Sequence, residues 1–318
     1  MYVQQIDSWR DSAVGGSEFE VGERQQVSNR QFRFRLALFT VLTGAGAAAT
    51  LAGSGWSRLP GQVLLGVMFA HALELQHQCL HGTGLATAAG NRWVGRLVGA
   101  PMLVSYSHYR ARHLRHHRYL GTDRDTEFFQ YAALEDLSVR GLLSSAFNVR
   151  RYGTFVRTAW RALRGERMED WTEPADDAAI RREYVALAAL VLVVVPAASV
   201  LTGSPVVLVL WLVPLLFAEP AHTLIELPEH IGCDTTSRDP LRNTRTIVGS
   251  RFSYWLTNGN NFHVEHHWKQ WLPISELPVL HRSVKDDIEV LVPTYWAFYR
   301  QIAAAVVARP TTAEEAIA

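Results

Sequence analysis

The sequence predicts an all-α integral membrane protein with four transmembrane helices in two hairpins and a helical, histidine-rich cap on the cytoplasmic side. The chain has 318 residues, of which 48% are hydrophobic and only 19% are charged. An ordinary soluble domain carries about 25% charged residues. Long stretches without any charge alternate with arginine-rich segments. Most of the 13 histidines gather at positions that these stretches would place on one side of a membrane.

The first predicted hairpin begins with residues 36–57, which carry no charge. A helix needs about 20 apolar residues to cross the hydrocarbon core, so this stretch is long enough. Residues 59–73 are also apolar in the main, apart from His71. Because 59–73 is short for a span, we expect its helix to continue through Glu74 and the first histidines, whose side chains then leave the hydrocarbon.

The second predicted hairpin is the uncharged stretch 184–218, which is 35 residues long. This length exceeds one span and suits two. Residues 203–205 (Gly-Ser-Pro) divide the stretch with turn-forming residues. Large soluble proteins also bury apolar helices, but charge-free stretches of this length favour membrane spans.

The distribution of basic residues predicts how the protein is oriented in the membrane. The connections within the two hairpins carry one charge, Arg58, whereas residues 92–182 carry many arginines. The positive-inside rule therefore places that segment, both termini and the histidine clusters in the cytoplasm. Only two of the 31 basic residues are lysines, a bias typical of GC-rich genomes, which indicates a bacterial inner membrane. We expect a polar N-terminal arm without a signal peptide (1–33), a single membrane domain (34–300) and a C-terminal tail (301–318).

Charge and cysteine content exclude several classes of function. With 31 basic and 30 acidic residues the formal net charge is +1, so nucleic acid is not an expected partner. Cys79 and Cys233 are the only two cysteines. They are too few for a disulfide scaffold and too far apart for a CxxC metal or redox motif.

Eight histidines fall into three clusters, at 77–81, 113–117 and 263–267. Residues three or four apart on a helix share one face, with their Cβ atoms about 5–6 Å apart. Imidazoles in this arrangement can converge on a metal ion. The predicted topology brings all three clusters to the same side of the membrane. Spacing alone leaves the metal open, because imidazole binds zinc, copper, nickel and iron.

The three clusters read HxxxH, HxxHH and HxxHH, with two spans between the second and the third. This pattern resembles the signature of the membrane fatty acid desaturase and hydroxylase superfamily. Residues 122–125 (Thr-Asp-Arg-Asp) and 261–267 (Asn-Phe-His-Val-Glu-His-His) are also similar to that family, and the resemblance extends over about residues 35–295. It implies a non-haem diiron centre, bound mainly by histidine, with O₂ as co-substrate.

The resemblance also implies the residues of the metal site. A further histidine near the end of the fourth span usually completes the set, and His230 is the better candidate here. His222 is the runner-up for that role. Glu226 occupies a slot where similar acyl-CoA desaturases have an asparagine, so Glu226 is a possible additional ligand. Asp123, Asp125 and Glu127 are expected either to orient imidazoles by accepting their second N–H or to pair with neighbouring arginines. Glu265 is expected to lie just outside the ligands. The ligands implied by the resemblance are His77, His81, His113, His116, His117, His230, His263, His266 and His267.

The activity implied is O₂-dependent desaturation of an acyl lipid or acyl thioester. The alternative is a hydroxylase or related oxygenase of an alkyl chain or a lipophilic natural product, because the clusters do not separate the two outcomes. A membrane metal transporter or a zinc hydrolase stays open as a remote alternative. A transporter would need ionisable residues within the spans, where only His71 and His222 qualify.

Electrons must come from another protein. The sequence contains no CxxC rubredoxin pattern, no evident haem-binding segment and no GxGxxG motif. We therefore expect a separate ferredoxin, rubredoxin or cytochrome with its reductase. An acidic carrier of this kind could dock on the arginines of residues 110–118 and 150–164 by electrostatic attraction.

Overall fold

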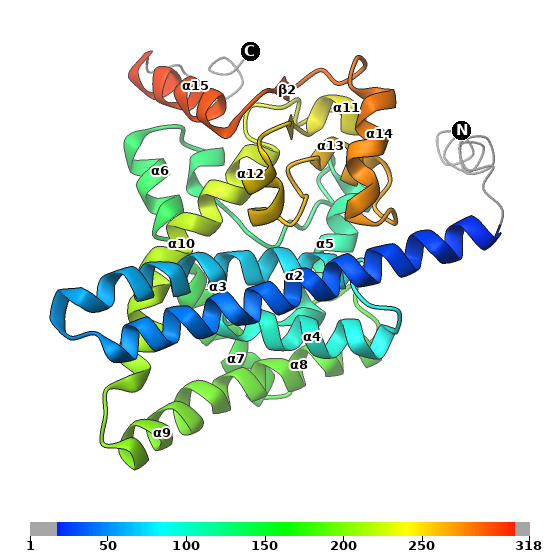
Figure 1. Ribbon diagram of the computed structural model, residues 1–318. Helices are drawn as coiled ribbons and strands as arrows, with labels where there is room; N and C mark the ends of the chain where they lie inside the picture. The colour runs from blue at the N-terminus through cyan, green and yellow to red at the C-terminus, as the bar shows by residue number, and fades with distance from the viewer. Residues whose placement is uncertain (1–17, 309–318) are drawn as a thin grey trace.

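The computed structural model describes residues 18–308, with side chains from Asn29 onward. Most of this part is helical (Figure 1). Parts of the predicted arm (1–17) and tail (309–318) lie outside the described residues, and the predicted boundaries at 33 and 300 fall inside the first and last helices. The elements are α2 (Glu18–Ala52), α3 (Leu59–Leu80), α4 (Ala88–Gly99), α5 (Tyr106–Tyr119), α6 (Val139–Ala146), α7 (Val149–Leu163), α8 (Pro174–Ala189), α9 (Val195–Thr202), α10 (Val213–Glu226), α11 (Pro240–Asn243), β1 (Thr246–Ile247), α12 (Arg251–Leu256), α13 (His263–Trp268), α14 (Leu277–Val284), β2 (Leu291–Val292) and α15 (Tyr295–Ala308).

Three helical stretches among the described residues are long and apolar enough to cross a membrane: Asn29–Ala52, Pro174–Thr202 and Leu208–Glu229. They correspond to the first, third and fourth predicted spans. The second predicted span is α3, which continues unbroken past Glu74 to Leu80 as expected. Its polar residues make α3 less apolar than the other three. Most of its side chains are buried, because α3 packs against α2, α4 and α10.

The predicted turn at 203–205 is present. Gly203 ends α9 in the left-handed conformation, with φ 57°. The helices on either side of this turn each contain a π-helical segment, at Leu190–Val194 and Leu208–Leu212. A proline follows each segment closely, Pro196 and Pro214. A proline has no N–H to donate to the preceding turn, and single π-helical turns accommodate such a break.

Small residues bring α3 into close contact with its neighbours. A Cβ atom on Gly66 would lie 2.5 Å from Cβ of Phe217 and 2.6 Å from the carbonyl oxygen of Pro214 in α10. Gly61 approaches α2 in the same way, with Oγ1 of Thr50 2.5 Å from its ideal Cβ position. Small residues at helix contacts are typical of membrane proteins, where van der Waals packing holds helices together. The position of α3 is thus fixed relative to both α2 and α10.

A continuous apolar core extends from α3 through α4, α5 and α10 to β1, β2 and α15. The two short strands pair in parallel, with Thr246 opposite Leu291 and Ile247 opposite Val292. In Figure 1, α11, α13 and α14 lie above the α2–α3 hairpin, whereas α8 and α9 lie below it. The core therefore joins the apolar helices to the β1–β2 pair and to α15.

The contact at Gly66 predicts a difference between two glycine substitutions. Gly66→Ala should destabilise the protein by about 1–3 kcal/mol, the usual cost of overpacking a close contact. Gly44→Ala in α2 should be neutral or stabilising by up to about 1 kcal/mol, because alanine has the higher helix propensity and no atom lies within 4 Å of the added Cβ. Thermal unfolding in detergent measures both. Equal melting temperatures for the two variants would contradict the close packing of α3 on α10.

Candidate metal centre

Four segments that are distant in sequence carry the predicted ligands. His77 lies in the last turn of α3, and His81 is its C-cap, followed by Gly82 with φ 72°. The second cluster occupies the C-terminal half of α5, and the third begins α13. His230 follows the short 3₁₀ turn Leu227–Glu229 at the end of α10.

A carboxylate from α8 holds the start of α5. Glu183 accepts hydrogen bonds from Ser105 Oγ at 2.7 Å, Ser107 N at 2.8 Å and Ser107 Oγ at 2.7 Å. It also pairs with Arg96 Nε at 2.6 Å. A negative charge is favourable here, because the first N–H groups of a helix have no partners within it. Glu183 thus fixes the helix that carries the second cluster.

Arg245 and Thr246 hold the segments with His230 and the third cluster, a role that the sequence pattern did not reveal. Arg245 is 1% exposed and donates to the carbonyl oxygens of Pro228 (2.5 Å) and Ile231 (2.7 Å). The Thr246 hydroxyl accepts a hydrogen bond from the backbone N–H of Val264 at 3.2 Å. These contacts fix the loop around His230 and the first turn of α13.

Five imidazoles form the first group, in which the candidate ligand atoms all lie within 4.8 Å of one another. Nε2 of His113 is at its centre. It lies 2.7 Å from Nε2 of His77, 3.0 Å from that of His81 and 2.9 Å from that of His117. The members of the first group are His77, His81, His113, His117 and His266.

Four imidazoles form the second group. Nε2 of His230 lies 3.3 Å from Nε2 of His116 and 3.2 Å from Nε2 of His263. His267 Nε2 is 3.1 Å from that of His263. The structure thus brings together all nine histidines that the sequence analysis names as ligands. They form two groups, and α5 and α13 each contribute different histidines to both.

The chemistry of both groups fits metal ions. Two nitrogen ligands about 2.1 Å from one ion and at right angles lie about 3.0 Å apart, close to the nitrogen separations observed here. Burial lowers the pKa of His113, His117 and His267 well below the usual range, so these rings are neutral and keep a free lone pair. Nε2 of buried His266 has no hydrogen-bond partner among the described residues. Neutral imidazoles that converge at this spacing are suited to bind a metal ion.

Outer contacts orient the rings of the second group. The Nδ1 atoms of three of its histidines contact oxygen acceptors: Asp125 Oδ1 at 2.8 Å from His116, the carbonyl oxygen of Asn243 at 3.1 Å from His230, and Asn260 Oδ1 at 3.0 Å from His263. An N–H bond on this side leaves Nε2 to face the interior of the group, where a metal ion would lie.

Asp123 and Glu265 do not contact the predicted ligands. Asp123 is exposed in the loop after α5, and no imidazole lies within hydrogen-bond distance of it in the described part of the chain. Glu265 instead pairs with His281 Nδ1 at 2.5 Å and accepts from Thr246 Oγ1 at 2.6 Å. Two residues along a helix turn the side chain by about 200°, which directs Glu265 away from His263. Among the described residues, no contact therefore supports a role of Asp123 or Glu265 in orienting ligand imidazoles.

Two carboxylates reach the inner side of the second group. Glu127 Oε2 lies 3.3 Å from Nε2 of His116, and Glu229 Oε2 lies 3.2 Å from Nε2 of His263. Asn260 Nδ2 donates to the other oxygen of Glu229 at 2.5 Å. Sequence reasoning expected Glu127 only as an outer contact and missed Glu229. Glu229 directly precedes His230 in the sequence, and this position was the one sequence feature that could have identified it.

His222 and Glu226, the two residues left open as additional ligands, lie together. His222 Nε2 is 3.6 Å from Glu226 Oε1. They form a separate group with Glu74 of α3, and none of the nine histidines belongs to it. The 3₁₀ turn at the end of α10 accounts for this separation, because it breaks the i, i+4 relation between Glu226 and His230.

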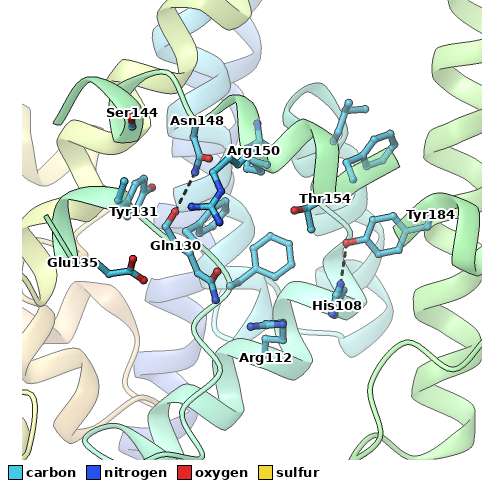
Figure 2. Close-up of a pocket in the computed structure, with 16 residues that line it drawn as sticks. His108, Arg112, Gln130, Tyr131, Glu135, Ser144, Asn148, Arg150, Thr154 and Tyr184 are labelled. Atoms are coloured by element: carbon cyan, nitrogen blue, oxygen red, sulfur yellow. Dashed lines mark hydrogen bonds between the residues drawn. The ribbon is translucent and has the colours of Figure 1, made fainter. Parts of the chain in front are cut away.

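A cavity of about 250 Å³ lies beside the centre, between α5, α7 and the loop at 128–132 (Figure 2). His108 projects into it and its Nδ1 contacts the Tyr184 hydroxyl at 2.9 Å. Asn148 donates to the carbonyl oxygen of Gln130 at 3.2 Å on the opposite side. None of the nine histidines lines this cavity. Sequence reasoning did not anticipate it, because its walls come from segments without a shared motif.

The two groups predict which histidines affect metal content. His266→Ala should lower the metal bound per chain, because it removes one nitrogen from the first group. His281→Asn is the matched control: His281 is also a histidine beside α13, but its Nδ1 bonds Glu265, and asparagine can keep that bond. Elemental analysis of detergent-purified protein, with circular dichroism to check folding, measures the effect. Unchanged metal in His266→Ala would contradict the site.

The chain was compared with known families and proteins. The fatty acid desaturase family model matches residues 54–299, which include every member of both histidine groups. No curated protein matches the chain significantly. Because the matched segment makes up most of the 318 residues, the chain belongs to the fatty acid desaturase family.

Proposed function

We propose that this chain is an integral membrane, non-haem diiron oxidoreductase that uses O₂ to desaturate an acyl lipid or an acyl thioester. The observation that carries the proposal is the pair of imidazole groups with nitrogens 2.7–3.3 Å apart. Family membership supports an oxidoreductase of the desaturase or hydroxylase type. Iron is the metal that this chemistry needs, because neither zinc nor any amino-acid side chain supplies the oxidant.

In this proposal the first group holds one iron and the second group, with Glu127 and Glu229 beside it, holds the other. Bound iron would supply the reductive activation of O₂ and an oxidant strong enough for an unactivated C–H bond. The protein positions the ions, excludes water and places the substrate. Desaturation removes two hydrogen atoms from the acyl chain, and with O₂, two electrons and two protons it yields an alkene and two waters.

We further propose four spans, with α3 as the second, and a metal site on the cytoplasmic side of a bacterial inner membrane. The apolar windows in Asn29–Ala52 and Pro174–Thr202 are only 11% buried within the protein. Apolar surface of this extent needs lipid around it. The arginines of residues 92–182 favour the cytoplasmic orientation.

Product analysis tests the reaction. Lipids and acyl thioesters from a bacterial host that expresses the chain should contain products lighter than their substrates by two hydrogen atoms. The same host with His266→Ala should lack them, because the first group would be incomplete. Mass spectrometry measures both extracts. Products heavier by one oxygen atom, with no alkene, would replace desaturation by the hydroxylase alternative.

Electron supply gives a second test. The purified chain should not turn over with NADH or NADPH and O₂ alone, and a ferredoxin with its reductase should restore turnover. The rate should fall several-fold between about 0.01 M and about 0.15 M salt, because the screening length drops from about 30 Å to about 8 Å. Turnover with a small neutral reductant should be insensitive to salt. Direct turnover with nicotinamide would contradict the proposed need for a carrier.

A further inference from the structure

A third group of metal-ligating side chains lies between α3 and α10. One carboxylate oxygen each from Glu74 and Glu226 and one ring nitrogen of His222 are within 4.8 Å of one another. His222 and Glu226 are four residues apart on α10, so they share one helix face. Glu74 reaches this face from α3, which packs closely on α10 at Gly66.

The ligand atoms of this group are buried without partners. Glu74 is 1% exposed and His222 is 2% exposed. Both carboxylate oxygens of Glu74 and Nε2 of His222 lack a hydrogen-bond partner among the described residues. Buried polar groups normally have such partners, and burying them without one is costly. Glu74 and Glu226 face each other, so these atoms are satisfied either by a proton shared between the two carboxyl groups or by a cation.

The charges at this place are not balanced by the protein. Within the described residues, neither Glu74 nor Glu226 has an arginine or lysine within 4.0 Å, and His222 is the one ion-pair partner of Glu226. Two carboxylates that share a buried position repel each other when both are ionised. A divalent cation between them would cancel both negative charges.

The outer contact of His222 matches that of a metal-bound histidine. Its Nδ1 contacts the Tyr131 hydroxyl oxygen at 2.9 Å, which leaves Nε2 directed toward Glu226. Metal-bound histidines typically donate the other ring N–H to an oxygen. Tyr131 also lines the cavity of Figure 2, so that cavity comes within one hydrogen bond of the third group.

We propose that Glu74, His222 and Glu226 form a third metal site, which binds one divalent first-row cation such as Mn²⁺, Fe²⁺ or Zn²⁺. One imidazole and two carboxylates suit these ions. The ion ties α3 to α10 and thereby fixes the last turn of α3, where His77 follows Glu74 by three residues. This site does not depend on whether the two histidine groups bind iron.

Metal stoichiometry tests the proposal. The full-length chain in detergent is stripped with a chelator, titrated with Mn²⁺, and its bound metal is measured by elemental analysis. Glu226→Gln and Glu74→Gln should each bind one ion fewer per chain than the wild type. Glu219→Gln is the matched control: Glu219 is a buried carboxylate on the same helix, but it already has Arg151 and Tyr152 as partners. This control should bind as many ions as the wild type.

Unfolding temperatures separate loss of the site from loss of the fold. Without metal, Glu226→Gln should unfold at the wild-type temperature or above it, because glutamine removes the repulsion with Glu74. With Mn²⁺, the rise in unfolding temperature should be smaller than in the wild type. The His266→Ala chain should still lose one ion upon Glu226→Gln. Equal stoichiometry in wild type and Glu226→Gln, or the same loss in Glu219→Gln, would overturn the proposal.

Discussion

The convergence of nine imidazoles in one buried volume is the constraint on which the rest of the structure depends. Their inward nitrogens approach to 2.7–3.3 Å, the separation of two nitrogen ligands on one metal ion. Burial makes protonation unfavourable, as the lowered pKa values of His113 and His267 indicate. The fold must therefore hold four chain segments together so that these nitrogens keep the spacing of metal ligands.

Buried contacts outside the two histidine groups hold these four segments in place, and each segment has a different contact. Close packing at Gly66 holds α3 on α10. Glu183 holds the start of α5. Arg245 binds two carbonyl oxygens around His230, with its guanidinium 4.9 Å from the centre of the Phe298 ring. Thr246 joins β1 to α13. Contacts of this kind fix ring orientation, on which metal affinity depends.

The two histidine groups differ in charge. The first contains imidazoles alone, whereas Glu127, Glu229 and Asp125 contact members of the second. Burial by itself would lower the pKa of His116, but Glu127 and Asp125 outweigh it and raise that pKa. Negative charge near an ion favours its higher oxidation state. The two proposed irons would therefore differ in redox properties, although both are surrounded mainly by histidine.

The sequence by itself determined the helical class, three of the apolar spans, the turn at Gly203 and the histidines that meet. These features follow from local patterns: charge-free length, turn residues, and spacing of three or four along a helix. Tertiary structure alone decided which histidines share a group, because that depends on how α3, α5 and α13 pack. It also decided the contacts of Glu229, the solvent-facing position of Asp123 and the pairing of Glu265 with His281. The 3₁₀ turn after α10 separates Glu226 from His230 and places Glu226 with Glu74, which lies 152 positions earlier in the chain; no local pattern encodes a contact between residues so far apart.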